Sequence, residues 1–157
     1  MKKGQVAMYI ILGLIIAVVA GGYIYVAKQT EKTPGPLKPG PENPDLTDDK
    51  VNLIAQNILQ ALNTGDYGNF TKDFSATLKD SMTAIKFTQL RNTVSVASGK
   101  YLSKSKPKKT LSSAYHSYTY DCNFEKENVQ LTLTFARNNN KVEGINLNSP
   151  NIAKAGQ

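Results

Sequence analysis

The fold is decided most clearly by residues 129–135, which read Val-Gln-Leu-Thr-Leu-Thr-Phe. Apolar and polar side chains alternate strictly through this stretch, as in a strand with one buried and one solvated face. Residues 118–124, Tyr-Thr-Tyr-Asp-Cys-Asn-Phe, repeat the alternation, so the two stretches predict antiparallel strands. Asparagines at 138–140 predict a turn, and residues 141–148 predict a return strand with a β-bulge at Gly144.

The residues before these strands have a helical period instead. A first helix is expected from Thr47, a good N-cap, to Gly65, and a third from Thr83 to about Ala97. A second, shorter helix between them is marked by four apolar residues, Tyr67, Phe70, Phe74 and Leu78. A short strand is expected at residues 100–102. The predicted fold class is therefore α+β, with three helices and an antiparallel sheet of about four strands.

The N-terminal segment from Val6 to Ala27 contains no charge. As a helix it would be roughly 33 Å long, enough to cross a bilayer core of about 30 Å. Lys2 and Lys3 precede it, which predicts a single-pass signal anchor in the cell membrane with the C-terminal domain outside. A cleaved secretory peptide ending near Ala20 is an alternative.

The chain divides into four parts on this interpretation. Residues 1–27 are the transmembrane signal anchor and residues 28–46 are a proline-rich linker with a reach of at most roughly 60 Å. Residues 47–152 form the folded domain, and residues 153–157 are a tail. The linker is expected to hold the domain clear of the membrane surface.

Composition excludes several classes of function. The net charge of +7 on 157 residues is modest, and no aromatic residues are interleaved with the lysines, so no nucleic acid is expected as a partner. Cys122 is the only cysteine, which excludes an internal disulfide framework. No catalytic motif, metal cluster or phosphate loop is present, so neither a cofactor nor a metal is expected.

Several stretches together resemble the nuclear transport factor two-like superfamily, and in particular its small exported domains of unknown function. They are residues 64–70 with Phe74, residues 98–101, residues 129–135 and residues 141–145. The resemblance implies a curved sheet wrapped around the helices in a cone, with a pocket at the open end. It also implies a possible homodimer through the sheet. The superfamily includes ketosteroid-isomerase-like enzymes and many domains that only bind or dimerise.

A second resemblance is confined to the N-terminus. Lys3-Gly4-Gln5 before the apolar segment is similar to an archaeal prepilin-type signal, although Tyr9 stands where a glutamate is usual. This resemblance implies cleavage after the glycine and a pilin-like surface assembly subunit that begins at Gln5.

Candidate site residues come from the aromatic and ionisable side chains. The ligand-binding candidates are Tyr67, His116, Tyr118 and Tyr120, and the last three share one parity along the chain that leads into residues 118–124. An isomerase-type enzyme would need an Asp or His base facing a Tyr donor inside the cone. The alternative reading is that these tyrosines are packed strand residues. Asp121 has the opposite parity and is expected to face water.

Two surface features complete the candidates. Lys104, Lys106, Lys108 and Lys109 form a basic loop that is either simply solvated or touches an anionic surface polymer or lipid headgroups. Asn69 begins a glycosylation sequon with Thr71, whereas the sequon at Asn148 is followed by a proline and is not usable.

The function expected from the sequence is a membrane-anchored extracytoplasmic binding or interaction domain without chemistry of its own. An isomerase- or hydratase-like enzyme acting on a small apolar ligand in the cone pocket is one alternative. A pilin-like surface assembly subunit is the other.

Overall fold

The computed structural model describes residues 46–112 and 114–155 of the 157-residue chain. The expected anchor at Val6–Ala27 and the greater part of the linker lie outside these residues. Within the described residues, no helix is both long enough and apolar enough to span a bilayer.

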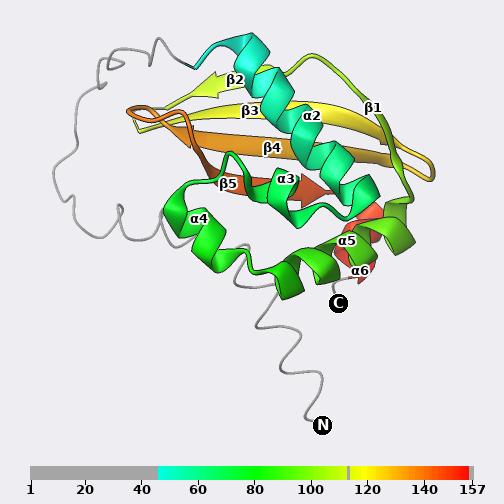
Figure 1. The fold of residues 1–157 in the computed structure, drawn as a ribbon. Helices are drawn as coiled ribbons and strands as arrows, with labels where there is room; N and C mark the ends of the chain where they lie inside the picture. Colours follow the sequence, from blue (N-terminus) through cyan, green and yellow to red (C-terminus); the bar gives the residue numbers. More distant parts are fainter. Residues whose placement is uncertain (1–45, 113, 156–157) are drawn as a thin grey trace, which may run out of the picture.

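The described domain is α+β, with helices packed on a curved antiparallel sheet of five strands (Figure 1). The helices in chain order are α2 (Asp48–Thr64), α3 (Tyr67–Thr71), α4 (Ala76–Ser81), α5 (Ala84–Ser98) and α6 (Pro150–Ala155). The strands are β1 (Tyr101–Lys104), β2 (Lys108–Leu111), β3 (Tyr115–Phe124), β4 (Asn128–Ala136) and β5 (Val142–Asn148).

The strand order is β1-β3-β4-β5, and β2 also pairs with β3. β1 and β2 follow one another along the same edge of β3, because Lys104 is opposite Cys122 and Lys108 is opposite Thr119. The expectation of about four strands missed β2. All four residues of β2 are exposed, so the strand has no alternation from which it could be recognised.

The alternation predicted for β3 and β4 is confirmed. Val129 is 1 % exposed, and Leu131, Leu133 and Phe135 are fully buried, whereas Gln130 on the other face is exposed. The buried face of β3 is equally well covered, by residues His116, Tyr118, Tyr120, Cys122 and Phe124. The register shifts between Thr134 and Phe135, opposite Gly144, which confirms the expected bulge in the β4–β5 pair.

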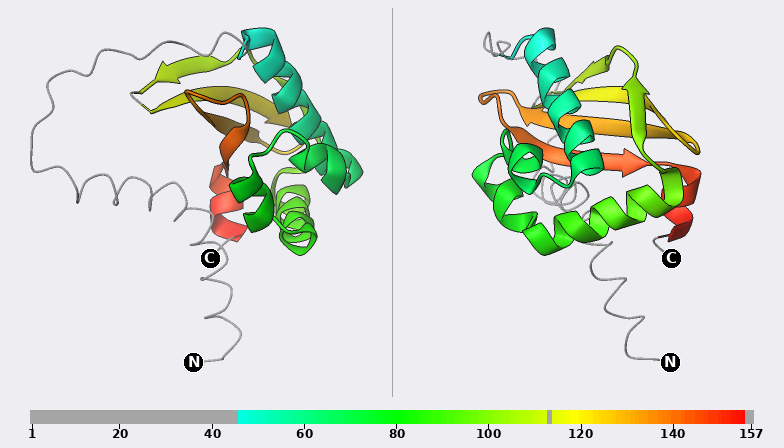
Figure 2. Two further views of the ribbon diagram at one scale, coloured as in Figure 1. Left: turned by 60° about the vertical axis from the view of Figure 1, so that its left-hand side comes forward. Right: turned by 45° about the vertical axis from the view of Figure 1, so that its right-hand side comes forward.

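Helix α2 lies across the inner face of the sheet, and α5 runs below it (Figures 1 and 2). Thr47 caps α2 as predicted, since its hydroxyl accepts a 3.3 Å hydrogen bond from the Lys50 amide. Gly65 and Gly99 end α2 and α5 with φ of 79° and 80°, a region that glycine enters without strain. A Cβ on Gly99 would also meet the Glu125 carboxylate at 2.7 Å.

The expectation of a single second helix between Tyr67 and Leu78 is wrong. The segment forms two helices, α3 and α4, because the chain between them pairs with β5. Val142 donates to the Asp73 carbonyl at 2.9 Å and accepts from the Ser75 amide at 2.9 Å. Phe70 and Phe74 do not lie in one helix, but their rings still pack edge to face, with centroids 5.3 Å apart.

Helix α6 was not predicted either. The expectation of three helices is therefore wrong twice, because the expected second helix is two helices, α3 and α4, and because α6 is additional. It extends from Pro150 to Ala155, beyond the expected domain end at Ile152. The six residues bury none of their own side chains completely, so no apolar period marks them in the sequence. The helix is held by Ile152, which packs partly buried against the core, and by hydrogen bonds from Ser149 and Asn151 to Glu127.

Candidate functional site

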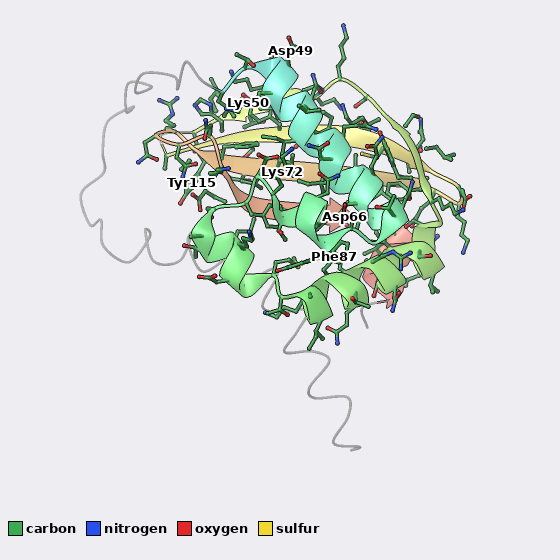
Figure 3. All side chains as sticks on the ribbon, viewed as in Figure 1. Asp49, Lys50, Asp66, Lys72, Phe87 and Tyr115 are labelled. Carbon is green, nitrogen blue, oxygen red and sulfur yellow. The ribbon has the colours of Figure 1, made fainter. Side chains whose placement is uncertain are left out.

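The four residues proposed as ligand contacts lie in two different places. His116, Tyr118 and Tyr120 share the inner face of β3 and are 1, 0 and 0 % exposed. Tyr67 belongs to another cluster: its hydroxyl donates to the Met82 carbonyl at 2.8 Å. Its ring packs against Phe87 of α5, which is labelled in Figure 3, with centroids 5.8 Å apart.

The inner tyrosines are packed as core residues. The Tyr118 ring is perpendicular to that of Phe135 at a centroid distance of 5.8 Å. The Tyr120 hydroxyl is buried and has no hydrogen-bond partner among the described residues. Burial, with smaller contributions from Tyr118, Asp48 and Cys122, raises the pKa of Tyr120 well above its usual value. Tyr120 is therefore a neutral phenol under all physiological conditions.

The basic loop does not form a single patch in the described structure. Lys104 and Lys109 turn towards the inner face, with their ammonium groups 4.7 Å from the Tyr120 ring centroid and 5.7 Å from that of Tyr118. Burial lowers the pKa of Lys104, against an opposing effect of Cys122. Lys108 instead lies on the outer face, and Lys106 is exposed between them.

Asp73 and Asp121 lie at the surface, whereas the sequon at Asn69 is partly buried. Asp73 lies 3.9 Å from the Lys141 ammonium group, and Asp121 is exposed on the outer face of the sheet. Asn69 lies in the one-turn helix α3, where Thr71 is buried and donates its hydroxyl to the Tyr67 carbonyl at 3.0 Å. Within the described part of the chain, no three His, Cys, Asp or Glu side chains are grouped closely enough to hold a metal ion.

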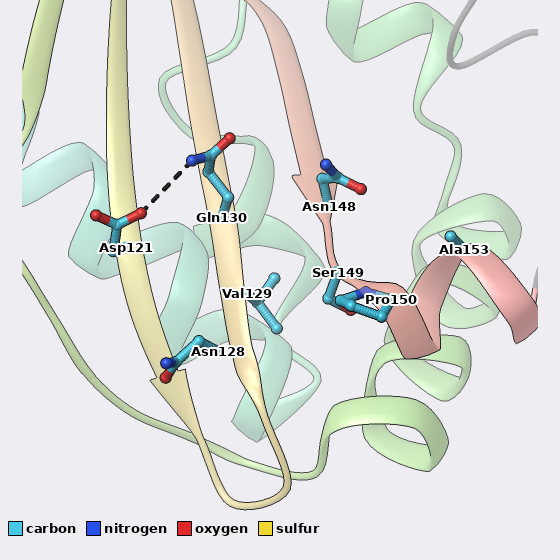
Figure 4. A pocket seen from close by; sticks show the side chains of 8 residues that line it. All are labelled: Asp121, Asn128, Val129, Gln130, Asn148, Ser149, Pro150 and Ala153. Atoms are coloured by element: carbon cyan, nitrogen blue, oxygen red, sulfur yellow. Dashed lines mark hydrogen bonds between the residues drawn. The ribbon is translucent and has the colours of Figure 1, made fainter.

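A groove of about 400 Å³ opens on the outer face of the sheet, between the ends of β3, β4 and β5 and helix α6 (Figure 4). It is lined by Asp121, Asn128, Val129, Gln130, Asn148, Ser149, Pro150 and Ala153. The polar side chains project from three neighbouring strands because alternate residues of each strand point to the outer face.

The polar groups of the groove are only partly used within the protein. The Gln130 amide donates to Asp121 at a long 3.5 Å, and Asp121 also lies 3.4 Å from the Lys108 ammonium group. No described residue forms a hydrogen bond with the side-chain amide of Asn128 or Asn148. Each of these amides therefore has two donors and an acceptor free for a ligand.

One wall of the groove is helix α6, and Glu127 holds it in place. Glu127 Oε1 accepts hydrogen bonds from Ser98 Oγ at 2.6 Å and Ser149 Oγ at 2.7 Å. Glu127 Oε2 accepts from the Asn151 amide at 3.3 Å. Desolvation acts to raise the pKa of Glu127, but these three hydrogen bonds and the nearby Lys154 together lower it. Glu127 thus ties α5, the β3–β4 turn and α6 to one charged group.

No pattern in the sequence marks the groove. Its polar residues have the parity of solvent-facing strand positions, and nothing in the pattern distinguishes Gln130 from Thr132 on the same face. Asn148-Ser149-Pro150 has the pattern of a glycosylation sequon that its proline makes unusable. The one indication in the sequence is that Asn148, Ser149 and Pro150 place a carboxamide, a hydroxyl and a proline together where the last strand ends.

Comparison with known proteins gives one match. Residues 55–145, more than half of the chain, match the family described as Protein of unknown function (DUF3887). No curated protein and no solved structure matches the chain. The match spans α2 from Ala55 onwards to Ile145 in β5, so it includes the β3 and β4 side of the groove. This α+β chain therefore belongs to the DUF3887 family of proteins of unknown function.

Proposed function

We propose that this protein is a membrane-anchored, extracytoplasmic binding module without chemistry of its own. The apolar segment Val6–Ala27 with Lys2 and Lys3 before it supports the anchor and the outward topology. The helices on the inner face of a curved sheet support the cone-like fold of the nuclear transport factor two-like superfamily. On this proposal the linker presents the domain to ligands of the cell surface.

Burial of the inner-face residues favours binding over catalysis. An isomerase or hydratase needs its base and its donor in contact with a substrate. His116, Tyr118 and Tyr120 are at most 1 % exposed, so a substrate would reach them only if the core opened. Asp73 and Asp121 lie outside this core and do not supply a base to it.

The observation that carries the proposal is the groove on the outer face. It combines free hydrogen-bonding groups on Asn128 and Asn148 with a hollow of about 400 Å³. Small-molecule and cofactor sites have volumes of about 300–1,000 Å³ and a small number of well-placed polar groups.

Sedimentation with the cell envelope tests this function. The full-length protein, held in lipid nanodiscs, is mixed with the insoluble envelope polymer of its own cells and then centrifuged. We expect the protein to sediment with the polymer, and a variant carrying both Gln130→Ala and Asn148→Ala to stay in solution. Tyr120→Phe is the control for the inner face and should sediment as the unaltered protein does. Sedimentation that ignores the groove variant but is lost in Tyr120→Phe would contradict the proposal.

A further inference from the structure

We propose that the groove on the outer face binds a segment of a neutral saccharide chain. This inference rests on the proposed function and names the ligand class for the same site. It follows from four properties of the groove: its charge, its free hydrogen-bonding groups, its apolar surface and its open shape.

The charge of the groove favours a neutral ligand. Asp121 is the only ionisable side chain that lines it, and its Oδ2 atom lies 3.4 Å from the Lys108 ammonium group. None of the residues that line the groove is a lysine or arginine, and Lys108 at its rim is already paired with Asp121, so an anionic polymer would find no unpaired cation in the lining. A cationic ligand would have to compete with Lys108 for a single exposed carboxylate.

The free polar groups of the groove can form hydrogen bonds with the hydroxyls of a sugar. Asn128, Gln130 and Asn148 each have a carboxamide, which offers donors and an acceptor side by side. A sugar hydroxyl is itself both donor and acceptor, so two neighbouring hydroxyls of one ring pair with one carboxamide. Asn128 and Gln130 lie at the start of β4, and Asn148 is the last residue of β5. All three side chains line the hollow (Figure 4).

The apolar surface is provided by α6. Pro150 and Ala153 are exposed and face the groove (Figure 4), which leaves a flat ring and a methyl group uncovered. The C–H face of a sugar ring is apolar enough to cover such a surface. Because Glu127 ties Ser149 and Asn151 to the β3–β4 turn, this wall is in position before a ligand arrives, and little ordering is required on binding.

The shape of the groove suits a segment of a chain. Its volume of about 400 Å³ is open to solvent, so a bound ring can continue into further rings outside it. A domain held outside the membrane on a linker with a reach of at most roughly 60 Å would meet such chains in the cell envelope.

Calorimetric titration of the full-length protein in lipid nanodiscs tests the ligand class. The probes are two neutral tetrasaccharides, chitotetraose and cellotetraose, the anionic tetragalacturonate, and the peptide tetraalanine. We expect at least one neutral tetrasaccharide to bind. Asn148→Ala should weaken that binding about tenfold, as expected for the loss of a group that makes more than one hydrogen bond. Asn146→Ala is the matched control, since it has the same residue type on the same strand but does not line the groove.

The outcomes separate the two proposals. If tetraalanine or tetragalacturonate binds with the same dependence on Asn148 and the neutral sugars do not, the ligand class is wrong and the binding function stands. If no probe binds in a way that depends on Asn148, the saccharide inference is overturned, and the proposed function is then decided by sedimentation alone. Equal weakening by Asn146→Ala and Asn148→Ala would overturn the assignment of the groove as the site.

Discussion

Glu127 and Ser149 are joined by a 2.7 Å hydrogen bond between the carboxylate and the hydroxyl. The same hydroxyl accepts from the Ile152 amide at 3.1 Å and so caps the first turn of α6. One carboxylate therefore positions a helix that has no fully buried side chain of its own. The wall of the groove depends on these polar contacts together with the partly buried Ile152, which packs against the core.

The first prediction concerns this contact. Glu127→Gln removes the negative charge, so the hydrogen bonds from Ser98, Ser149 and the Asn151 amide weaken. We expect faster hydrogen–deuterium exchange of the α6 amides with little change in the amides of β4. Glu143→Gln is the control, because Glu143 bonds to Asn139 at a distance from α6. Equal protection of α6 in both variants would show that the carboxylate does not hold the helix.

Acid should have the same effect in the unaltered protein. Hydrogen bonds hold the folded pKa of Glu127 below its usual 4.5, so the contribution to stability is complete above that pH. It is lost as the pH falls through the folded pKa. We therefore expect α6 to lose exchange protection below pH 4.5 while remaining protected at pH 6. Loss of protection between pH 6 and 8 would contradict this assignment.

The second prediction concerns the two faces of β4. Leu133 is fully buried, so Leu133→Ala should reduce the free energy of unfolding by about 2–5 kcal/mol. Thr132 is on the outer face, where its hydroxyl lies 3.2 Å from that of Thr119, and Thr132→Ala should cost about 0.5–1.5 kcal/mol. Denaturant titration at several protein concentrations measures both. A cost of Thr132→Ala that changes with protein concentration would identify the outer face as the surface between two copies of the chain.

The third prediction concerns Tyr120. Its hydroxyl is buried without a hydrogen-bond partner among the described residues, which is unfavourable in the folded state. Tyr120→Phe should therefore leave the stability unchanged or raise it by up to about 1 kcal/mol, measured by denaturant titration. A loss of more than about 1 kcal/mol would mean that the hydroxyl is engaged in the folded protein.

Cys122 provides the fourth prediction. It is fully buried, and burial raises the pKa of its thiol to about 11, with Lys104 acting in the opposite direction. At pH 8 about one thiol in a thousand would be ionised. We expect no reaction with a maleimide in the folded protein within an hour and rapid reaction in denaturant. Fast labelling under native conditions would show that the β3 core opens readily.

The strand alternation allowed most of the sheet to be predicted. Leu131 and Tyr120 are opposite one another and both fully buried, as their parity required. Such agreement follows because a slip of one residue would expose the whole apolar set. Helix α2 was equally predictable, since Thr47 and Gly65 are both strong signals for helix ends.

The elements that were missed are held by contacts that leave no period in the sequence. Lys108 to Leu111 form a strand by pairing with the edge of β3, and α6 is held by Glu127 and by the single apolar contact of Ile152. The break between α3 and α4 arises from the pairing of Val142 with Asp73 and Ser75, which are far apart in sequence. The groove was missed for the same reason, because Gln130 and Asn148 become neighbours only through the register of β4 and β5.

The central claim, a domain outside the membrane whose groove is occupied at the cell surface, is tested most directly by cysteine labelling of intact cells. Ala153→Cys places a thiol in the groove, and Asn146→Cys places one on the same side of the sheet outside it. The native Cys122 is buried and should not interfere. A membrane-impermeant maleimide is applied to intact cells and, separately, to each purified full-length variant.

We expect Asn146→Cys to be labelled at similar rates in both settings, and Ala153→Cys to be labelled clearly more slowly on intact cells than after purification. Labelling of either variant only after lysis would contradict the outward topology. Equal rates for Ala153→Cys in both settings would contradict an occupied groove, and with it the proposal that this domain binds a ligand there.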